Sequence, residues 1–149
     1  MKMRSILLVL SVVFAFSCSK NDPAIQTPPF LNARADGVVK DCNVVRVTLT
    51  AGILQINAQT TAGDVTFVLS VTNYTSGQIG TFNIGPGNFN TALYREGTTS
   101  FSAGTSAGTG RIQITNSSPT QLDGTFEFTG VSNGGASKVI TEGRFTAYF

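Results

Sequence analysis

The segment TFEFTG, Thr125–Gly130, alternates polar and apolar side chains. A period of two residues is typical of a β-strand, because successive side chains of a strand point to opposite faces. The segment RFTAYF, Arg144–Phe149, has the same period, so one face of each strand is expected to be buried and the other to meet water. The side chains expected on the buried faces are Phe126, Phe128, Phe145, Ala147 and Phe149.

The same period extends over much of the chain from Phe30 onward. These segments are rich in β-branched and aromatic residues, and Gly or Gly-Asp turns separate them. They are VVRVTLT (44–50), ILQINAQT (53–60), VTFVLSV (65–71) and RIQIT (111–115). No window of eleven residues after Cys18 has the spacing of an amphipathic helix. The sequence therefore predicts successive antiparallel strands and no helix.

Turn residues divide these strands. The Asp-Gly pairs at 36–37 and 123–124 are expected to form tight turns, in which φ must be positive. The segment REGTTSFSAGTSAGTG, 95–110, is dominated by Ser, Thr and Gly. It is expected to be either a long hairpin arm or a mobile loop.

The number and composition of the strands predict the fold class. A chain of 149 residues is long enough for one domain and too short to expect two. Nine of its eleven phenylalanines follow Cys18, and a single open sheet could not bury them on one side. We therefore expect residues 30–149 to form one antiparallel domain, a β-sandwich or flattened barrel of about 8 to 10 strands.

Three stretches carry a family resemblance: IGTFNIG (79–85), SAGTGRIQITNSSPTQLDGTFEFTG (106–130) and ITEGRFTAYF (140–149). Their order resembles that in a family of small Bacteroidota lipoproteins with an all-β domain of unknown function. The resemblance covers residues 80–149, and more faintly the hairpin ARADGVV at 33–39. It implies a fold and a cellular location, and it supplies no catalytic residues.

The first 17 residues have the composition of a secretory signal. Lys2 and Arg4 precede an apolar run from Ile6 to Phe16, and the small residue Ser17 follows it. The run is too short to span a hydrocarbon core of roughly 30 Å. We therefore expect residues 1–17 to be a lipoprotein signal peptide that is removed.

The four residues AFSC, 15–18, resemble the lipobox of bacterial lipoproteins. The resemblance implies that the thiol of Cys18 is linked to diacylglycerol and that Cys18 becomes the acylated first residue, held at the membrane by its acyl chains. Residues 18–29, with three prolines, are expected to form an extended tether. The cysteine count leaves open a plain secreted protein with a disulfide between Cys18 and Cys42.

The residues SKND, 19–22, resemble the short tag of surface-exported lipoproteins in Bacteroidota-like bacteria. Ser19, rather than Asp, follows the cysteine and does not indicate retention at an inner membrane. We therefore expect an outer-membrane lipoprotein, with its domain facing either the cell surface or the periplasm.

Composition argues against several chemistries. The chain contains no histidine, which is the commonest general base and the commonest metal ligand. The Cys and His clusters of a zinc site are missing. Without residues 1–17 the chain has eight basic and eight acidic residues and no basic block, so nucleic acid is not expected as a partner. We expect no cofactor, no metal and no enzyme activity.

Carboxylates are the remaining catalytic candidates. Two of them about 5 to 10 Å apart could hydrolyse a glycosidic bond. The candidates are Asp64, Glu96, Asp123, Glu127 and Glu142. A position on the solvent-facing side of a strand already explains why residue 127 is Glu, and an expected Asp-Gly turn explains why residue 123 is Asp. A carboxylate-dependent glycan hydrolase is therefore the alternative to a non-catalytic module.

Three residues are the candidates for contact with a ligand. Tyr94 and Arg95 lie where the segment 95–110 begins, and Tyr148 alternates with Phe145 and Phe149, which places it on an outer face. An exposed tyrosine ring can stack on a ligand. The expected function is a binding or structural β module, with a protein or a glycan as the partner.

Overall fold

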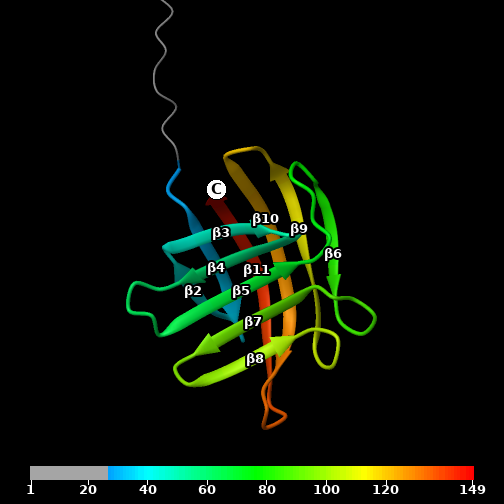
Figure 1. Cartoon of the computed structure of the whole chain (residues 1–149). Coiled ribbons are helices and arrows are strands. Elements are labelled where there is room, and N and C mark those ends of the chain that lie inside the picture. The colour runs from blue at the N-terminus through cyan, green and yellow to red at the C-terminus, as the bar shows by residue number, and fades with distance from the viewer. Residues whose placement is uncertain (1–26) are drawn as a thin grey trace, which may run out of the picture.

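The computed structural model describes residues 27–149, and these residues form an all-β structure of eleven strands. Figure 1 shows the strands in two layers that cross one another steeply. Within residues 27–149, no helix is long and apolar enough to cross a bilayer. The strands are β1 (Phe30–Ala35), β2 (Val38–Cys42), β3 (Val44–Thr50), β4 (Ile53–Gln59), β5 (Val65–Val71), β6 (Gly80–Ile84), β7 (Thr91–Glu96), β8 (Thr99–Ala103), β9 (Thr109–Ser117), β10 (Gln121–Val131) and β11 (Ser137–Tyr148).

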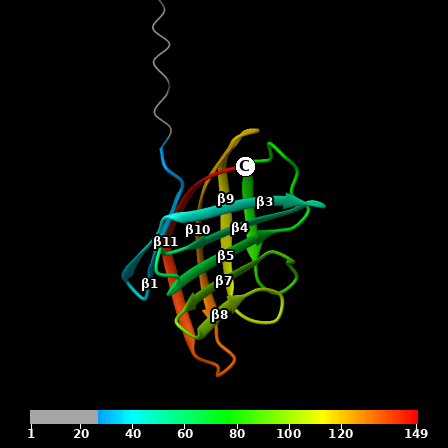
Figure 2. The same ribbon diagram turned by 60° about the vertical axis from the view of Figure 1, so that its left-hand side comes forward.

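One antiparallel, nearly closed sheet runs through both layers. Its strand order is β2-β1-β11-β10-β8-β7-β5-β4-β3, and β9 and β6 extend it from β10. The first layer contains β2, β1, β11, β10, β9 and β6, and the second contains β8, β7, β5, β4 and β3 (Figure 2). We call these layers A and B.

The two layers are joined at two corners. At one corner the far end of β10 pairs with β8 through Val131 and Ser102. At the other corner β2 runs directly into β3, with only Asn43 between them. Strand β3 also contacts β11 of the other layer. The result is a barrel-like fold in which the hydrophobic core lies between the layers.

The expected fold class is confirmed. The predicted segments at 44–50 and 65–71 coincide with β3 and β5, and those at 53–60 and 111–115 overlap β4 and β9. The strands number eleven rather than eight to ten, because the segment 95–110 forms a β7–β8 hairpin and the beginning of β9. The hairpin interpretation is therefore correct for residues 95–103, and residues 104–108 form a loop between β8 and β9.

The two Asp-Gly pairs lie in different kinds of structure, one in a turn and one inside a strand. Asp36 and Gly37, with φ of 47° and 82°, form the predicted tight turn between β1 and β2. Asp123 and Gly124 lie inside β10, so the turn predicted there is wrong. At that position Gly124 is paired with Phe145, and the space above the glycine holds the phenylalanine ring.

Four of the five side chains expected to face the core do so. Phe126, Phe128, Phe145 and Ala147 are at most 3% exposed. The expectation for Phe149 is wrong, because this residue lies beyond the end of β11 and its side chain is 47% exposed. Strand alternation predicts which side chains are buried only where neighbouring strands extend far enough to cover them.

Candidate functional site

The residues proposed for ligand contact lie in three separate places. Tyr94 is 0% exposed and belongs to the core, where its ring packs against Phe67 and Phe101. Its position on β7 points inward, as the alternation of that strand requires. A ligand on the outer surface has no access to it, so the contact expected for Tyr94 is corrected.

Tyr148 lies at the end of β11 and is partly buried. Its hydroxyl donates a hydrogen bond of 2.6 Å to the carbonyl oxygen of Thr27. This contact joins the last strand to the beginning of the described chain. The hydroxyl of Tyr148 therefore already has a backbone partner, and Tyr148 does not lie beside Tyr94 or Arg95.

Arg95 is exposed and points away from the core on layer B. Its Nη2 donates a hydrogen bond of 3.1 Å to Oγ1 of Thr66 on the neighbouring strand β5. Of the three predicted residues, Arg95 is the one that lies beside a surface groove, because Thr66 lines that groove.

The outward side chains of layer B form a continuous polar surface, which we call the outer face. The core-facing side chains of these strands are apolar and largely buried, and the strand alternation directs the others outward. The outer face consists of Val44, Arg46, Thr48, Thr50, Ile53, Gln55, Asn57, Gln59, Thr66, Val68, Ser70, Thr91, Leu93, Arg95, Ser100 and Ser102.

Strand pairing orders these side chains into rows that run across the strands. One row is Val44, Gln59, Thr66, Arg95 and Ser100. A second row is Arg46, Asn57, Val68, Leu93 and Ser102. Neighbouring strands lie about 4.8 Å apart, so each row of five extends over roughly 19 Å.

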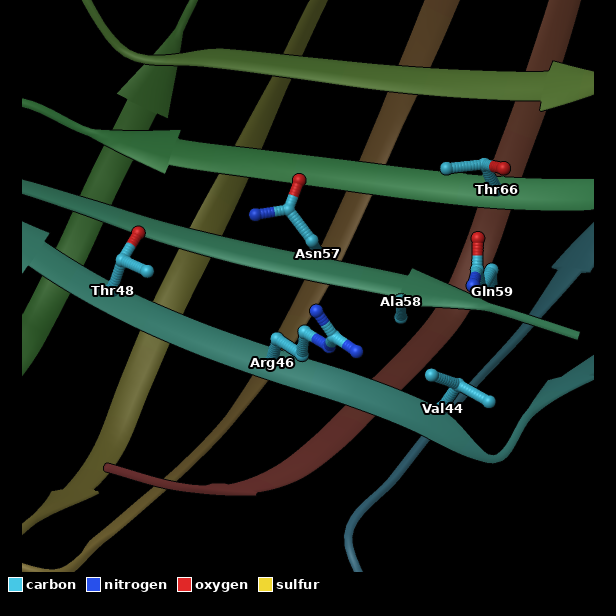
Figure 3. Close-up of a pocket in the computed structure, with 7 residues that line it drawn as sticks. All are labelled: Val44, Arg46, Thr48, Asn57, Ala58, Gln59 and Thr66. Carbon is cyan, nitrogen blue, oxygen red and sulfur yellow. The ribbon is translucent and has the colours of Figure 1, made fainter.

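A groove of about 400 Å³ lies on the β3–β4–β5 part of this face. Figure 3 shows Arg46 extending from β3 toward β4, with Asn57 and Gln59 on β4 and Thr66 on β5. The lining groups that can form hydrogen bonds are a guanidinium, two amides and two hydroxyls. The groove therefore offers donors and acceptors beside apolar surface, to which Val44 and Ala58 contribute.

A second hollow, of about 600 Å³, lies at the other side of the outer face. Its lining includes Ser100 and Ser102 of β8, together with Asn133 and Gly134 of the β10–β11 turn. Arg95 lies between the two hollows, because its strand neighbours Thr66 and Ser100 each line one of them. The two hollows and Arg95 therefore form one extended surface.

Cations on this face lack ionic partners. Within residues 27–149, neither Arg46 nor Arg95 takes part in an ion pair. The residues that line the two hollows include no carboxylate. Asp64, in the turn between β4 and β5, accepts a hydrogen bond from the hydroxyl of Thr60. The outer face therefore carries two arginines without matching negative charge.

None of four surface pockets within residues 27–149 brings two carboxylates together. Four surface pockets within residues 27–149 are lined by at most one carboxylate each, which is Glu127 in the pocket over β9, β10 and β11. Glu96, Glu127 and Glu142 form ion pairs with Lys40, Arg111 and Arg34, respectively. The structure therefore adds no geometric support to the hydrolase alternative.

Asp123 is a structural carboxylate. It accepts hydrogen bonds of 2.8 to 3.0 Å from Asn116, Gln121 and Thr146. Partial burial opposes ionisation, but the hydrogen bonds from Gln121, Asn116 and Thr146 outweigh it and lower the pKa of Asp123. These bonds link three neighbouring strands of layer A, which accounts for an acid at this position.

Cys42 lies at the corner between β2 and β3 and is 2% exposed. Burial, with smaller contributions from Asp41 and Asp64, raises the pKa of its thiol to about 11. Such a thiol is an inert part of the core rather than a nucleophile. Cys18, the expected signal peptide at 1–17 and most of the expected tether at 18–29 lie outside the described residues, and the disulfide alternative involves that part of the chain.

The sequence also contains a signal for the outer face. At outward positions of the predicted strands 44–50 and 53–60, the residues are Arg, Thr, Gln and Asn rather than Lys and Glu. An ordinary solvated strand face more often carries charged residues of both signs. Amide and hydroxyl side chains on adjacent strands could have identified the groove.

The described domain matches the model of a known protein family. Residues 27–148 match a domain of unknown function, DUF6252, and this match covers every strand from β1 to β11. Neither the curated proteins nor the solved structures contain a significant match to this chain. The chain therefore belongs to the family defined by the domain of unknown function DUF6252.

Proposed function

We propose that this protein is a non-catalytic, lipid-anchored lipoprotein of the outer membrane in a Bacteroidota-like bacterium, and that its β domain binds a partner through the outer face. The observation that carries the binding role is the groove over β3, β4 and β5, with its hydrogen-bonding side chains and unpaired Arg46. A domain with a purely structural role has no need of such a groove on its solvent side.

The position of the anchor is compatible with binding at the outer face. Thr27, where the described chain begins, contacts Tyr148 at the end of β11. The hollow at Ser100 and Asn133 lies at the opposite end of β11, and twelve strand residues extend over roughly 36 Å. An acylated Cys18 would hold the Thr27 end toward the membrane and leave the far end of the outer face accessible.

Metabolic labelling with an alkyne-tagged palmitate tests the anchor. The wild-type chain should be labelled and should sediment with outer-membrane vesicles, because two or more acyl chains give stable attachment. Mass spectrometry should find a mature amino-terminal peptide that begins with acylated Cys18.

The matched variants are Cys18→Ser and Cys42→Ala. Cys18→Ser should lose the label, and Cys42→Ala should keep it, because Cys42 is buried in the core. A mature peptide with unmodified Cys18 linked to Cys42 would instead identify a plain secreted protein. Digestion of whole cells with a protease distinguishes surface exposure from a periplasmic domain.

A further inference from the structure

The positive charge of the outer face is suited to an anionic ligand. Arg46 and Arg95 lie on neighbouring rows, and within residues 27–149 no carboxylate pairs with either. A guanidinium binds a carboxylate through two parallel hydrogen bonds, and this geometry favours arginine for the recognition of planar anions. Of the other exposed arginines, Arg34 and Arg111 are paired with Glu142 and Glu127, whereas Arg144 on layer A has no ion pair within residues 27–149 and lies outside the four surface pockets.

The remaining polar groups are suited to hydroxyls. Amides of Asn57 and Gln59 each offer two donors and an acceptor, and the hydroxyls of Thr48, Thr66 and Ser100 both donate and accept. A ligand with many hydroxyl groups, which also donate and accept, can satisfy such a surface at many points. An anion without hydroxyls would leave most of these groups bonded to water alone.

The shape of the surface favours an extended ligand. Two hollows lie on the same sheet, and Arg95 lies between their linings. The paired strands hold the rows in place, so little conformational entropy is lost when a ligand binds. An extended chain laid across the five strands would reach both hollows.

Other partners match this surface less well. Single-stranded nucleic acids bind to aromatic side chains, and no aromatic side chain of β3, β4, β5, β7 or β8 points outward. Protein interfaces have a buried apolar or aromatic centre, whereas the centre of this face has only Val68 and Leu93 among polar neighbours.

We infer that the outer face of layer B binds an acidic polysaccharide with carboxylate groups, which lies across the strands with its carboxylates at Arg46 and Arg95 and its hydroxyls on the amide and hydroxyl side chains. This inference rests on the proposed binding role of the same face and specifies the class of ligand.

The test uses the full mature chain with Cys18→Ser, which removes the acylation site, and affinity electrophoresis through gels that contain one polymer each. The acidic polymers are polygalacturonate, alginate and hyaluronate, and the neutral control is carboxyl-reduced polygalacturonate. We expect at least one acidic polymer to retard the protein, the neutral control to have no effect, and added salt to weaken the retardation.

Variants distinguish a specific site from general charge. Replacement of both arginines, Arg46→Gln with Arg95→Gln, should weaken binding at least tenfold, because each removes a charge-assisted contact. The matched control Arg111→Gln with Arg144→Gln removes the same two charges from layer A and should bind like the parent. Both variants should keep the parent melting temperature, because these side chains are exposed.

The inference would be overturned by no retardation with any acidic polymer, by equal binding of parent and Arg46→Gln with Arg95→Gln, or by an equal loss in the control Arg111→Gln with Arg144→Gln. Retardation by the neutral polymer that is lost in Asn57→Ala with Gln59→Ala would also overturn the anionic class, while it would support the binding role of the face. The anchor is tested separately by the label on Cys18, so failure of the ligand class and failure of the proposed location are distinguishable.

Discussion

Tyr94 illustrates how much a single position depends on its surroundings. Its ring is fully buried among aromatic neighbours, and its hydroxyl makes no hydrogen bond of normal geometry among the described residues, although the Glu96 carboxylate lies close enough to affect its pKa. Burial raises the pKa of Tyr94, and the neighbouring carboxylate of Glu96 adds to this rise. The hydroxyl therefore stays protonated, and it has exchanged its hydration for no more than a weak contact with Glu96.

We predict that Tyr94→Phe leaves the domain at least as stable as the parent. The variant keeps the ring and removes a buried polar atom, so the free energy of unfolding should stay within about 0.5 kcal/mol or rise by about 1 kcal/mol. Urea denaturation measures this difference. Tyr94→Ala is the control and should lose about 3 to 5 kcal/mol, because it leaves a cavity. A loss of more than 1 kcal/mol in Tyr94→Phe would mean that the hydroxyl has a stabilising partner.

At the scale of strands, β10 and β11 are held together by an exchange of phenylalanine and glycine. Gly124 is paired with Phe145, and Phe126 is paired with Gly143. Each ring occupies the space that the opposite residue leaves by lacking a side chain: a methyl group on Gly143 would lie 2.7 Å from Cδ1 of Phe126. These pairs explain why glycine lies inside two long strands, where it otherwise weakens a sheet.

We predict that Gly143→Ala lowers the free energy of unfolding by about 1 to 3 kcal/mol, because the added methyl group forces the ring of Phe126 or the strand to move. Thermal and urea unfolding both measure the loss. The matched control is Gly134→Ala in the β10–β11 turn, where the nearest atom to the added carbon is 4.0 Å away. That variant should be neutral or slightly stabilised. Equal effects of the two variants would contradict the packing argument.

At the scale of the whole molecule, an ion cluster ties layer A to layer B. Lys40 on β2 lies 2.6 Å from Glu96 on β7, and Lys138 on β11 lies 4.0 Å from the same carboxylate. Lys138 also contacts Asp36 at 3.1 Å. The hydrogen bond from Lys40, the main cause, and the charges of Lys40 and Lys138 lower the pKa of Glu96.

This cluster predicts a dependence of stability on pH. A lowered pKa in the folded state means that the pair with Glu96 stabilises the domain above the ordinary pKa of a glutamate, near 4.5, and that this contribution is lost as the pH falls through the lowered value. Because the side chain of Glu96 is 42% exposed, the contribution should be only about 0.5 to 1 kcal/mol.

The measurement compares the melting temperature of the parent with that of Glu96→Gln at pH 7 and at pH 3. The variant should melt lower at pH 7, and the difference should shrink at pH 3. Glu127→Gln is the control, because its pair with Arg111 lies within layer A and is about half exposed. A difference between parent and Glu96→Gln that stays constant with pH would contradict the role of the ion pair.

The alternation of residues predicted the strands well, because periodicity is a local property of the chain. It predicted the first and last residues of β3 and β5 correctly, and it identified the inward positions Phe126 and Phe145. It failed at Asp123 and Gly124, because a local turn signal is overridden when a long strand has partners on both sides. It failed for Phe149, because burial at a strand end depends on how far the neighbouring strands extend.

The sequence by itself determined the all-β class, the strand periods and the absence of histidine chemistry, since each follows from residue type and local order. Only the tertiary structure decided which strands are neighbours. That choice placed Tyr94 in the core and Arg95 outside, and it brought Arg46, Asn57, Thr66 and Ser100 onto one face from four strands. Such a surface depends on pairings between residues far apart in the chain, and the local alternation of each strand is the same whichever strands lie beside it.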